Sequence, residues 1–104
     1  MLSFLLAMAM VMQADTTRAA RETFTRCLHQ FVESSVTARK TQDQFTAEYA
    51  QACAAEQTAF REAVIRRDMA MRSTRTSAAQ SADLEVEDAR VNYSERFAMA
   101  ITPR

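Results

Sequence analysis

The most restrictive feature of this sequence is that it contains no glycine, and its only proline, Pro103, lies next to the C-terminus. Glycine supplies the positive-φ positions of tight turns, and proline interrupts regular structure. A sheet protein of this size needs several such turns, whereas a few long helices with short polar connections need very few. The composition therefore predicts an all-α protein. It also excludes the P-loop and the dinucleotide-binding fingerprint, which both need glycine-rich loops.

The length of the chain indicates a single domain, and its balanced charge indicates that the domain has no strong electrostatic field. It has 104 residues, and its 13 acidic side chains balance its 13 basic ones. Domains of this size commonly fold around one core. A formal net charge of zero gives no long-range attraction to nucleic acid or to an anionic membrane. We therefore predict one helical domain over residues 15–104.

The N-terminal segment, residues 1–14, differs from the rest of the chain. Its sequence, MLSFLLAMAMVMQA, is almost continuously apolar and contains no charged side chain. A short apolar run that ends near small residues is the pattern of a secretory signal, and Ala14 suits the position before a cleavage site. The usual Lys or Arg before the apolar run is absent, and Met12 is larger than the small residue normally found there. We predict that residues 1–14 are a cleaved signal peptide.

Cleavage of this signal would place the mature protein in the bacterial periplasm or outside the cell. If the segment is not a signal, the protein is cytoplasmic. Two other interpretations remain open: residues 1–14 are retained and pack in the core or in an oligomer, or they anchor the chain to a membrane. A helix of about eleven residues rises only about 16 Å, against about 30 Å for a bilayer core, so no stable membrane span is expected.

Apolar residues recur at spacings of three and four along the rest of the chain, which predicts amphipathic helices. Asp15 is a suitable N-cap for the first of them. Its apolar face consists of Phe24, Cys27, Leu28, Phe31, Val32 and Ser35. Thr41 and Gln44 have the spacing of a capping box, so we predict a turn at residues 39–41 and a second helix from Thr41. The alternative is one helix that continues through this point.

Two further helices complete the predicted fold. The second has an alanine-rich apolar face of Phe45, Tyr49, Ala52, Cys53, Phe60, Ala63, Val64 and Met71. Residues 72–77 are polar and mostly have short side chains, a pattern that predicts the second connection. The third helix has one row of Leu84, Val91 and Ala98 and a second row of Val86, Ala89, Tyr93, Phe97 and Ile101. The predicted fold is a small bundle, an antiparallel helical hairpin with a third packed helix.

Cys27 and Cys53 are the most informative pair of side chains. If the chain folds back near residue 40, residues whose numbers sum to about 80 lie opposite each other, as these two cysteines do. The same register places Phe31 opposite Tyr49, and the small Ala52 allows the close approach that a disulfide needs. We predict a disulfide that locks the hairpin. Two buried free thiols, or bridges between two chains, are the alternatives.

Few residues have the spacing of a catalytic or metal site. The only histidine, His29, follows Cys27 by two positions, so on one helix the two side chains point in different directions. The chain has no CxxC motif for zinc or redox chemistry. Met69 and Met71 are interpreted as core or boundary residues rather than as copper ligands. We therefore expect no catalytic residue, cofactor, metal ion or small-molecule substrate.

One segment of the chain concentrates charged side chains. Its arginines are Arg61, Arg66, Arg67, Arg72 and Arg75, and the acids that follow are Asp83, Glu85, Glu87 and Asp88. We interpret the acids as residues near a helix N-terminus, where the helix dipole favours them, and as partners that neutralise the arginines. The alternative is that the arginines bind the phosphates of nucleic acid.

Taken together, the sequence predicts an exported, non-enzymatic helical protein that acts through contact with a protein partner or through self-association. The alternative from another class is a cytoplasmic nucleic-acid-binding or regulatory helical protein that uses the five arginines.

Overall fold

The computed structural model describes the backbone of residues 2–103 and the side chains of residues 16–103. These residues form four helices: α1 (Leu2–Thr37), α2 (Gln42–Tyr49), α3 (Ala54–Ala70) and α4 (Arg75–Ile101). The all-α fold predicted from the sequence is confirmed, and so is the turn at residues 39–41. The second connection is also present but ends earlier than predicted, because α4 already begins at Arg75. The predicted signal peptide, residues 1–14, lies outside the part of the chain whose side chains are described.

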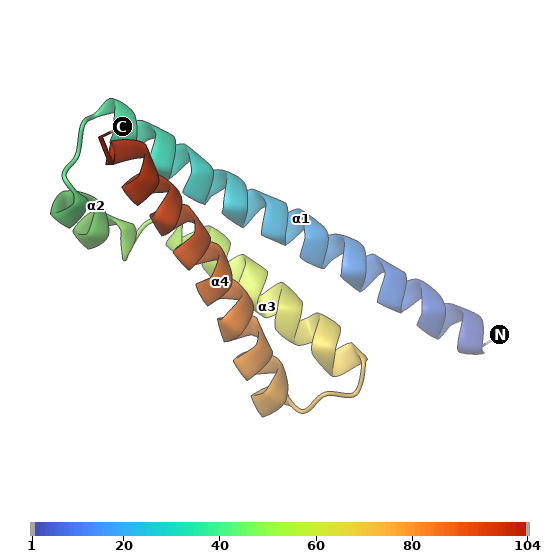
Figure 1. The fold of residues 1–104 in the computed structure, drawn as a ribbon. Coiled ribbons are helices and arrows are strands. Elements are labelled where there is room, and N and C mark those ends of the chain that lie inside the picture. Colours follow the sequence, from blue (N-terminus) through green and yellow to red (C-terminus); the bar gives the residue numbers. More distant parts are fainter. Residues whose placement is uncertain (1, 104) are drawn as a thin grey trace.

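The four helices form a small bundle. The chain runs along α1, turns, and returns through α2 and α3, so that α1 and α3 are antiparallel (Figure 1). α4 then runs back in the direction of α1, and the C-terminal ends of α1 and α4 lie at the same end of the bundle (Figure 1). Helices α1, α3 and α4 pack against one another in all three pairs. This arrangement is the predicted antiparallel hairpin with a further packed helix.

The returning arm of the hairpin differs from the prediction, because it is two helices rather than one. α2 ends at Tyr49, and α3 begins at Ala54, directly after Cys53, whose φ of 60° is left-handed. The intervening alanines and glutamine favour helix, so the break has no local signature in the sequence. The beginning of α1 also differs. Asp15 lies inside α1 rather than at its N-cap, because the helix extends back to Leu2.

Two threonines determine where α2 and α4 begin. The Gln44 N–H donates to Thr41 Oγ1 at 3.1 Å, and the Thr41 N–H donates to Gln44 Oε1 at 2.9 Å. These two bonds complete the predicted capping box. At the start of α4, the Ser77 N–H donates to Thr74 Oγ1 at 3.1 Å. Each bond satisfies an amide that has no partner inside its helix, so local sequence is sufficient to fix both starts.

The ends of α1 and α3 show how a chain without glycine terminates a helix. Arg39 and Arg72 adopt left-handed φ angles of 56° and 73°. After Arg39, the Lys40 N–H donates to the Ser35 carbonyl at 3.1 Å, and the equivalent bond after Arg72 measures 3.0 Å. These are Schellman motifs, in which the left-handed residue is usually glycine because glycine has no Cβ. Arginine occupies that position twice in this protein.

Replacement of Arg72 by glycine should therefore stabilise the fold. A Cβ atom in the left-handed region costs about 1–2 kcal/mol, and part of that gain is offset by the greater freedom of glycine in the unfolded chain. We expect a net gain of roughly 0.5–1 kcal/mol, seen as a rise of a few degrees in Tm by calorimetry. Arg72→Ala is the matched control, because it removes the same guanidinium but keeps the Cβ. Equal Tm values for the two variants would contradict the prediction.

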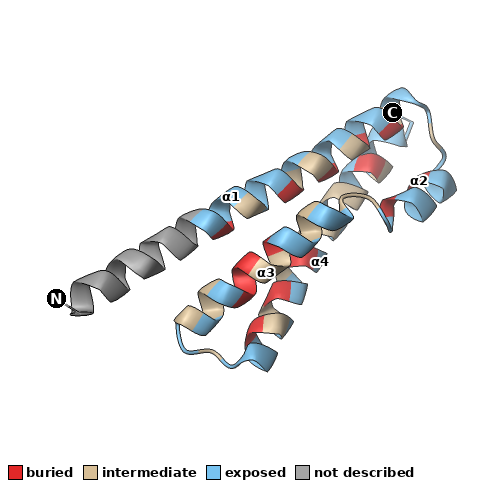
Figure 2. Cartoon of the chain, turned by 180° about the vertical axis from the view of Figure 1, so that it is seen from behind, coloured by how far each residue is buried: buried red, intermediate tan, exposed pale blue. Residues whose placement is uncertain are grey.

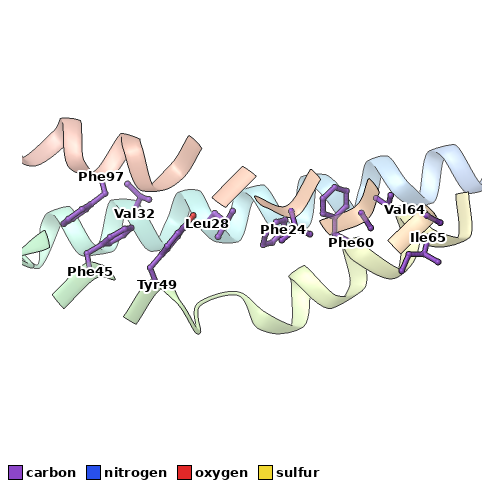
Figure 3. Close-up of a cluster of buried hydrophobic side chains, with 12 residues drawn as sticks. Phe24, Leu28, Val32, Phe45, Tyr49, Phe60, Val64, Ile65 and Phe97 are labelled. Carbon is purple, nitrogen blue, oxygen red and sulfur yellow. The ribbon is translucent and has the colours of Figure 1, made fainter. Parts of the chain in front are cut away.

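The core extends along the hairpin, and all four helices contribute to it (Figure 3). Its buried side chains include Phe24, Leu28, Val32, Phe45, Tyr49, Phe60, Val64, Ile65 and Phe97. At the α2 end, the Phe45 ring stacks on those of Phe97 and Tyr49, with centroids 4.0 and 4.8 Å apart. Near the α3–α4 connection, α4 instead contributes the small side chains of Ala78 and Ala82. The core is therefore aromatic at one end and thin at the other.

Half of the predicted apolar-face positions are buried and most of the others are half-buried, but one predicted row lies largely on the surface. Val86 and Phe97 of α4 face the core, as predicted. Leu84 and Val91 are exposed, because their row lies on the opposite side of the same helix; α4 is buried along one side and exposed along the other (Figure 2). Two other predicted core residues, Met71 and Ile101, are also exposed, because they lie at the ends of α3 and α4. Ile65 is buried, although the predicted face did not include it.

Candidate interaction surface and the disulfide junction

The two cysteines predicted to pair meet at the break between α2 and α3. Cys27 comes from the C-terminal third of α1, and Cys53 is the residue before α3. Their sulfur atoms are 2.01 Å apart and their Cα atoms 5.9 Å apart. This Cα separation is typical of a disulfide. The structure thus brings the predicted residues together within one chain and ties α1 to the break in the returning arm.

Arg90 of α4 holds the same junction through hydrogen bonds. Its Nη1 donates to the Tyr49 carbonyl at 2.8 Å, its Nη2 donates to the Ala52 carbonyl, and its Nε donates to Gln57 Oε1. The two carbonyls lie at the end of α2 and in the turn that follows. Such carbonyls lack partners within their helix and carry partial negative charge, so a guanidinium is well suited to them. Arg90 therefore acts as the cap of α2 from a distant helix.

Arg90 was not among the functional residues predicted from the sequence. Its type is not distinctive in a chain whose basic residues are nearly all arginine. Its position contains a signal, however, because it follows Val86 by four residues and precedes Phe97 by seven. On a helix this places Arg90 on the row that faces the core. A charged residue on a buried row needs partners there, and those partners are the carbonyls of the break.

Tyr49 links the same junction to the core. Its ring is almost fully buried, and its hydroxyl donates to the Arg90 carbonyl at 2.7 Å. Burial raises the pKa of Tyr49 from 10.0 to about 12, although the nearby Arg90 guanidinium opposes this shift. The phenol therefore stays protonated in the folded protein at a pH where the unfolded chain has already lost the proton.

This raised pKa predicts a loss of stability in alkaline solution. Because the unfolded chain releases the tyrosine proton first, the free energy of unfolding should fall as the pH rises from about 10 to about 12. Tyr49→Phe should remove most of that fall and should cost about 1 kcal/mol at neutral pH through the lost hydrogen bond. Urea titrations across this pH range would measure both effects. Tyr93→Phe is the control and should retain most of the alkaline fall, because the charge of Tyr93 is a smaller cause of the raised Tyr49 pKa than burial is. A fall of the same size in Tyr49→Phe as in the wild-type protein would refute the assignment.

An open groove of about 350 Å³ lies over the disulfide. It is lined by Cys27, Gln30, Phe31, Ser34, Lys40, Ala52 and Cys53. Lys40 Nζ is 4.8 Å from the centre of the Phe31 ring and 2.6 Å from Glu48 Oε2. Both cysteines are half-buried and line this groove, so the disulfide junction lies next to the surface.

Ion pairs divide the predicted arginine cluster. Arg61 contacts Asp83 at 2.8 Å, and Arg67 contacts Glu85 at 3.0 Å. Glu85 is also 2.7 Å from Arg21 of α1, so one carboxylate joins three helices. The prediction that acids of the last helix neutralise these arginines is confirmed for Asp83 and Glu85. The pairing turns part of the cluster into a salt-bridged surface between helices.

The remaining charged residues of that segment are exposed. Arg66, Arg72 and Arg75 lie on α3 and around the α3–α4 connection, and Glu87 and Asp88 lie on α4. No ion pair within residues 16–103 involves these five side chains. The prediction that the helix dipole favours these acids is wrong. α4 begins at Arg75, so the acidic segment lies beyond the first turn, where the dipole has little effect.

The other residues considered for chemistry lie apart from one another. His29 is exposed and its Nε2 is 4.0 Å from Glu33 Oε1, as expected of a surface residue near that acid. Within the described part of the chain, no group of three or more His, Cys, Asp or Glu side chains is arranged to hold a metal ion. Among the same residues, no helix has the length and apolar character needed to cross a membrane.

The exposed side of α4 carries a row of apolar residues that alternate with acids. We call this row the α4 outer face; its residues are Leu84, Asp88, Val91, Glu95 and Met99. At about 100° per residue, all five fall within a sector of about 80°. The apolar members retain much of their accessible surface: 63% for Leu84, 48% for Val91 and 76% for Met99. The helix thus presents a second apolar row to solvent, in addition to the one in the core.

The fold and these contacts define a small all-α protein in which a disulfide and a distant arginine hold a broken helical hairpin. Comparison of the chain with protein-family models, with curated proteins and with solved structures found no match. What the protein does must therefore follow from its own residues.

Proposed function

We propose that this chain is an exported bacterial protein that acts by binding another protein through the α4 outer face. The observation that carries the proposal is the alignment of Leu84, Val91 and Met99 on one exposed side of a helix whose other side is in the core. Isolated apolar residues are common on protein surfaces, but aligned ones on a single helix face are typical of contact sites. The helix is held in place by Arg90 and by the Glu85 ion pairs, so the face is presented on a rigid support.

Two observations support the exported location. Residues 1–14 have the pattern of a signal peptide, and Cys27 and Cys53 lie at bonding distance. Structural disulfides persist in oxidising compartments and are rare in the cytoplasm. Intact-mass spectrometry of the protein from its native cells, before and after reduction, tests this part. We expect a chain that begins near residue 15 and has no titratable thiol; a full-length chain with two free thiols would refute export.

The binding role is tested in living cells by site-specific photo-crosslinking. A photoreactive residue at position 84 or 91 should yield a discrete crosslinked protein of higher mass. The same residue at position 71 is the matched control, because Met71 is similarly exposed but lies at the α3–α4 connection. Discrete products at 84 and 91 but not at 71 support the proposal, and equal results at all three positions contradict it.

A further inference from the structure

We infer that the partner of the α4 outer face is a basic amphipathic helix of another protein, which places apolar side chains on Leu84 and Val91 and cationic side chains on Asp88 and Glu95. This inference rests on the proposed function, since it names the partner of the same surface. Two observations carry it: apolar and acidic residues alternate along the face, and the acids of the face form no ion pair within residues 16–103.

The spacing of the face favours a helix as the occupant. Leu84 and Val91 are seven residues apart, and Met99 follows after eight more. A repeat of seven is the one that two packed helices share, because it keeps the contact residues on one side over successive turns. The row from residue 84 to residue 99 extends for about 22 Å along α4, so a partner helix of about four turns would cover it.

The acids determine the charge of the occupant. Asp88 lies between Leu84 and Val91, Glu95 lies between Val91 and Met99, and Glu87 flanks the row. Within residues 16–103, no ion pair involves any of these three carboxylates. The neighbouring acids Asp83 and Glu85 are already paired with arginines of the same chain. An occupant that covers the apolar residues must bring cations to Asp88 and Glu95, because unpaired carboxylates are costly to bury.

The same argument excludes a second copy of α4 as the occupant. In a parallel pair, Asp88 and Glu95 would each face their own counterpart. In an antiparallel pair that places Leu84 opposite Val91, Asp88 would face Glu87. The antiparallel register that centres on Val91 would instead place Glu87 opposite Glu95. Each of these registers brings like charges together, which disfavours the pair.

The inference is tested with two labelled helical peptides of three heptads. One has leucine at its a positions and lysine at its d positions, and the other has glutamate in place of each lysine. Fluorescence anisotropy should detect binding of the lysine peptide to the full chain, with affinity that falls as salt rises. The glutamate peptide should bind at least about tenfold more weakly, because its charges repel Asp88 and Glu95.

Matched variants of the protein separate the apolar and electrostatic contributions. The double substitution Leu84→Gln with Val91→Gln should weaken binding of the lysine peptide by about tenfold or more. Asp88→Lys with Glu95→Lys should reverse the preference between the two peptides. Met71→Gln removes an equally exposed apolar side chain elsewhere and should leave binding unchanged. All of these residues are exposed, and circular dichroism should show that every variant is folded.

Three outcomes would overturn the inference. The first is equal binding of the two peptides, or binding that Asp88→Lys with Glu95→Lys does not change. The second is a dimer in analytical ultracentrifugation that Leu84→Gln with Val91→Gln abolishes, which would make a second copy the occupant. The third is binding to phosphatidylcholine vesicles that the same double variant abolishes. If photo-crosslinking at positions 84 and 91 succeeds but the lysine peptide fails, the proposed function stands and the partner chemistry is wrong.

Discussion

Reduction of the Cys27–Cys53 bond should lower the free energy of unfolding by about 3.5 kcal/mol. The two cysteines are 26 residues apart, and the estimate follows from the chain entropy that a bridge of this length removes from the unfolded state. In a domain of this size such a loss corresponds to a fall in Tm of roughly 15 °C or more. The effect is large relative to the total stability of a small domain with a thin core. Thermal unfolding with and without a phosphine reductant measures it.

A double variant provides the control for this experiment. Cys27→Ser with Cys53→Ser should melt close to the reduced wild-type protein, and the reductant should not change its Tm. Since both cysteines line an open groove, we expect reduction to be complete without denaturant. An unchanged Tm in the reduced wild-type protein, with both thiols titrated, would show that the bond does not contribute to stability.

Arg90→Ala should be the most damaging substitution of a single charged residue among those that the structure describes. It would leave the Ala52 carbonyl without its donor and the Tyr49 carbonyl with only the Ala52 N–H at 3.1 Å. It would also remove the cation that lies 5.0 Å from the Tyr49 ring centre. Hydrogen bonds from a charged donor contribute about 1.5–3 kcal/mol each. Water that reaches the carbonyls in the variant replaces part of this contribution. We expect a loss of about 3 kcal/mol in urea unfolding.

The matched control for this substitution is Arg96→Ala. Arg96 lies on the same helix, is exposed, and contacts the Tyr93 ring at 4.5 Å. Its removal should cost no more than about 0.5–1 kcal/mol. Hydrogen exchange adds a local readout, because the amides of residues 50–57 should lose protection in Arg90→Ala but not in Arg96→Ala. Similar losses in the two variants would show that the capping bonds of Arg90 add little.

The hairpin could be predicted because independent local signals agree on one turn. Thr41 and Gln44 mark the start of a helix, and the register they imply brings Cys27 to Cys53. The structure contains both the capping box and the cysteine pair. Agreement between a cap, a register and a pair of cysteines is stronger evidence for the turn than any one of the three signals alone. The apolar face of α1 followed from helical spacing alone.

The remaining features depend on contacts between residues that are distant in sequence. The break after Tyr49 is capped by Arg90, which lies 38 residues beyond Ala52, and the residues of the break themselves favour helix. The two apolar rows of α4 also have similar helical spacing. Spacing predicts a row but not which row faces the core, and packing against α1 and α3 determined that the Val86 row is buried. Leu84 and Val91 of the α4 outer face therefore belonged to a predicted apolar row and are found on the surface.

The two ends of the bundle should open with very different ease. The covalent bond, the Arg90 contacts and the stacked rings all lie towards the α2 end, while small alanines line α4 near the α3–α4 connection. Thermal fluctuations should therefore fray the molecule from that connection, where Arg72 and Arg75 are exposed. A trypsin nick there would leave α4 attached only by noncovalent contacts, while α1 to α3 would stay joined as one covalent piece.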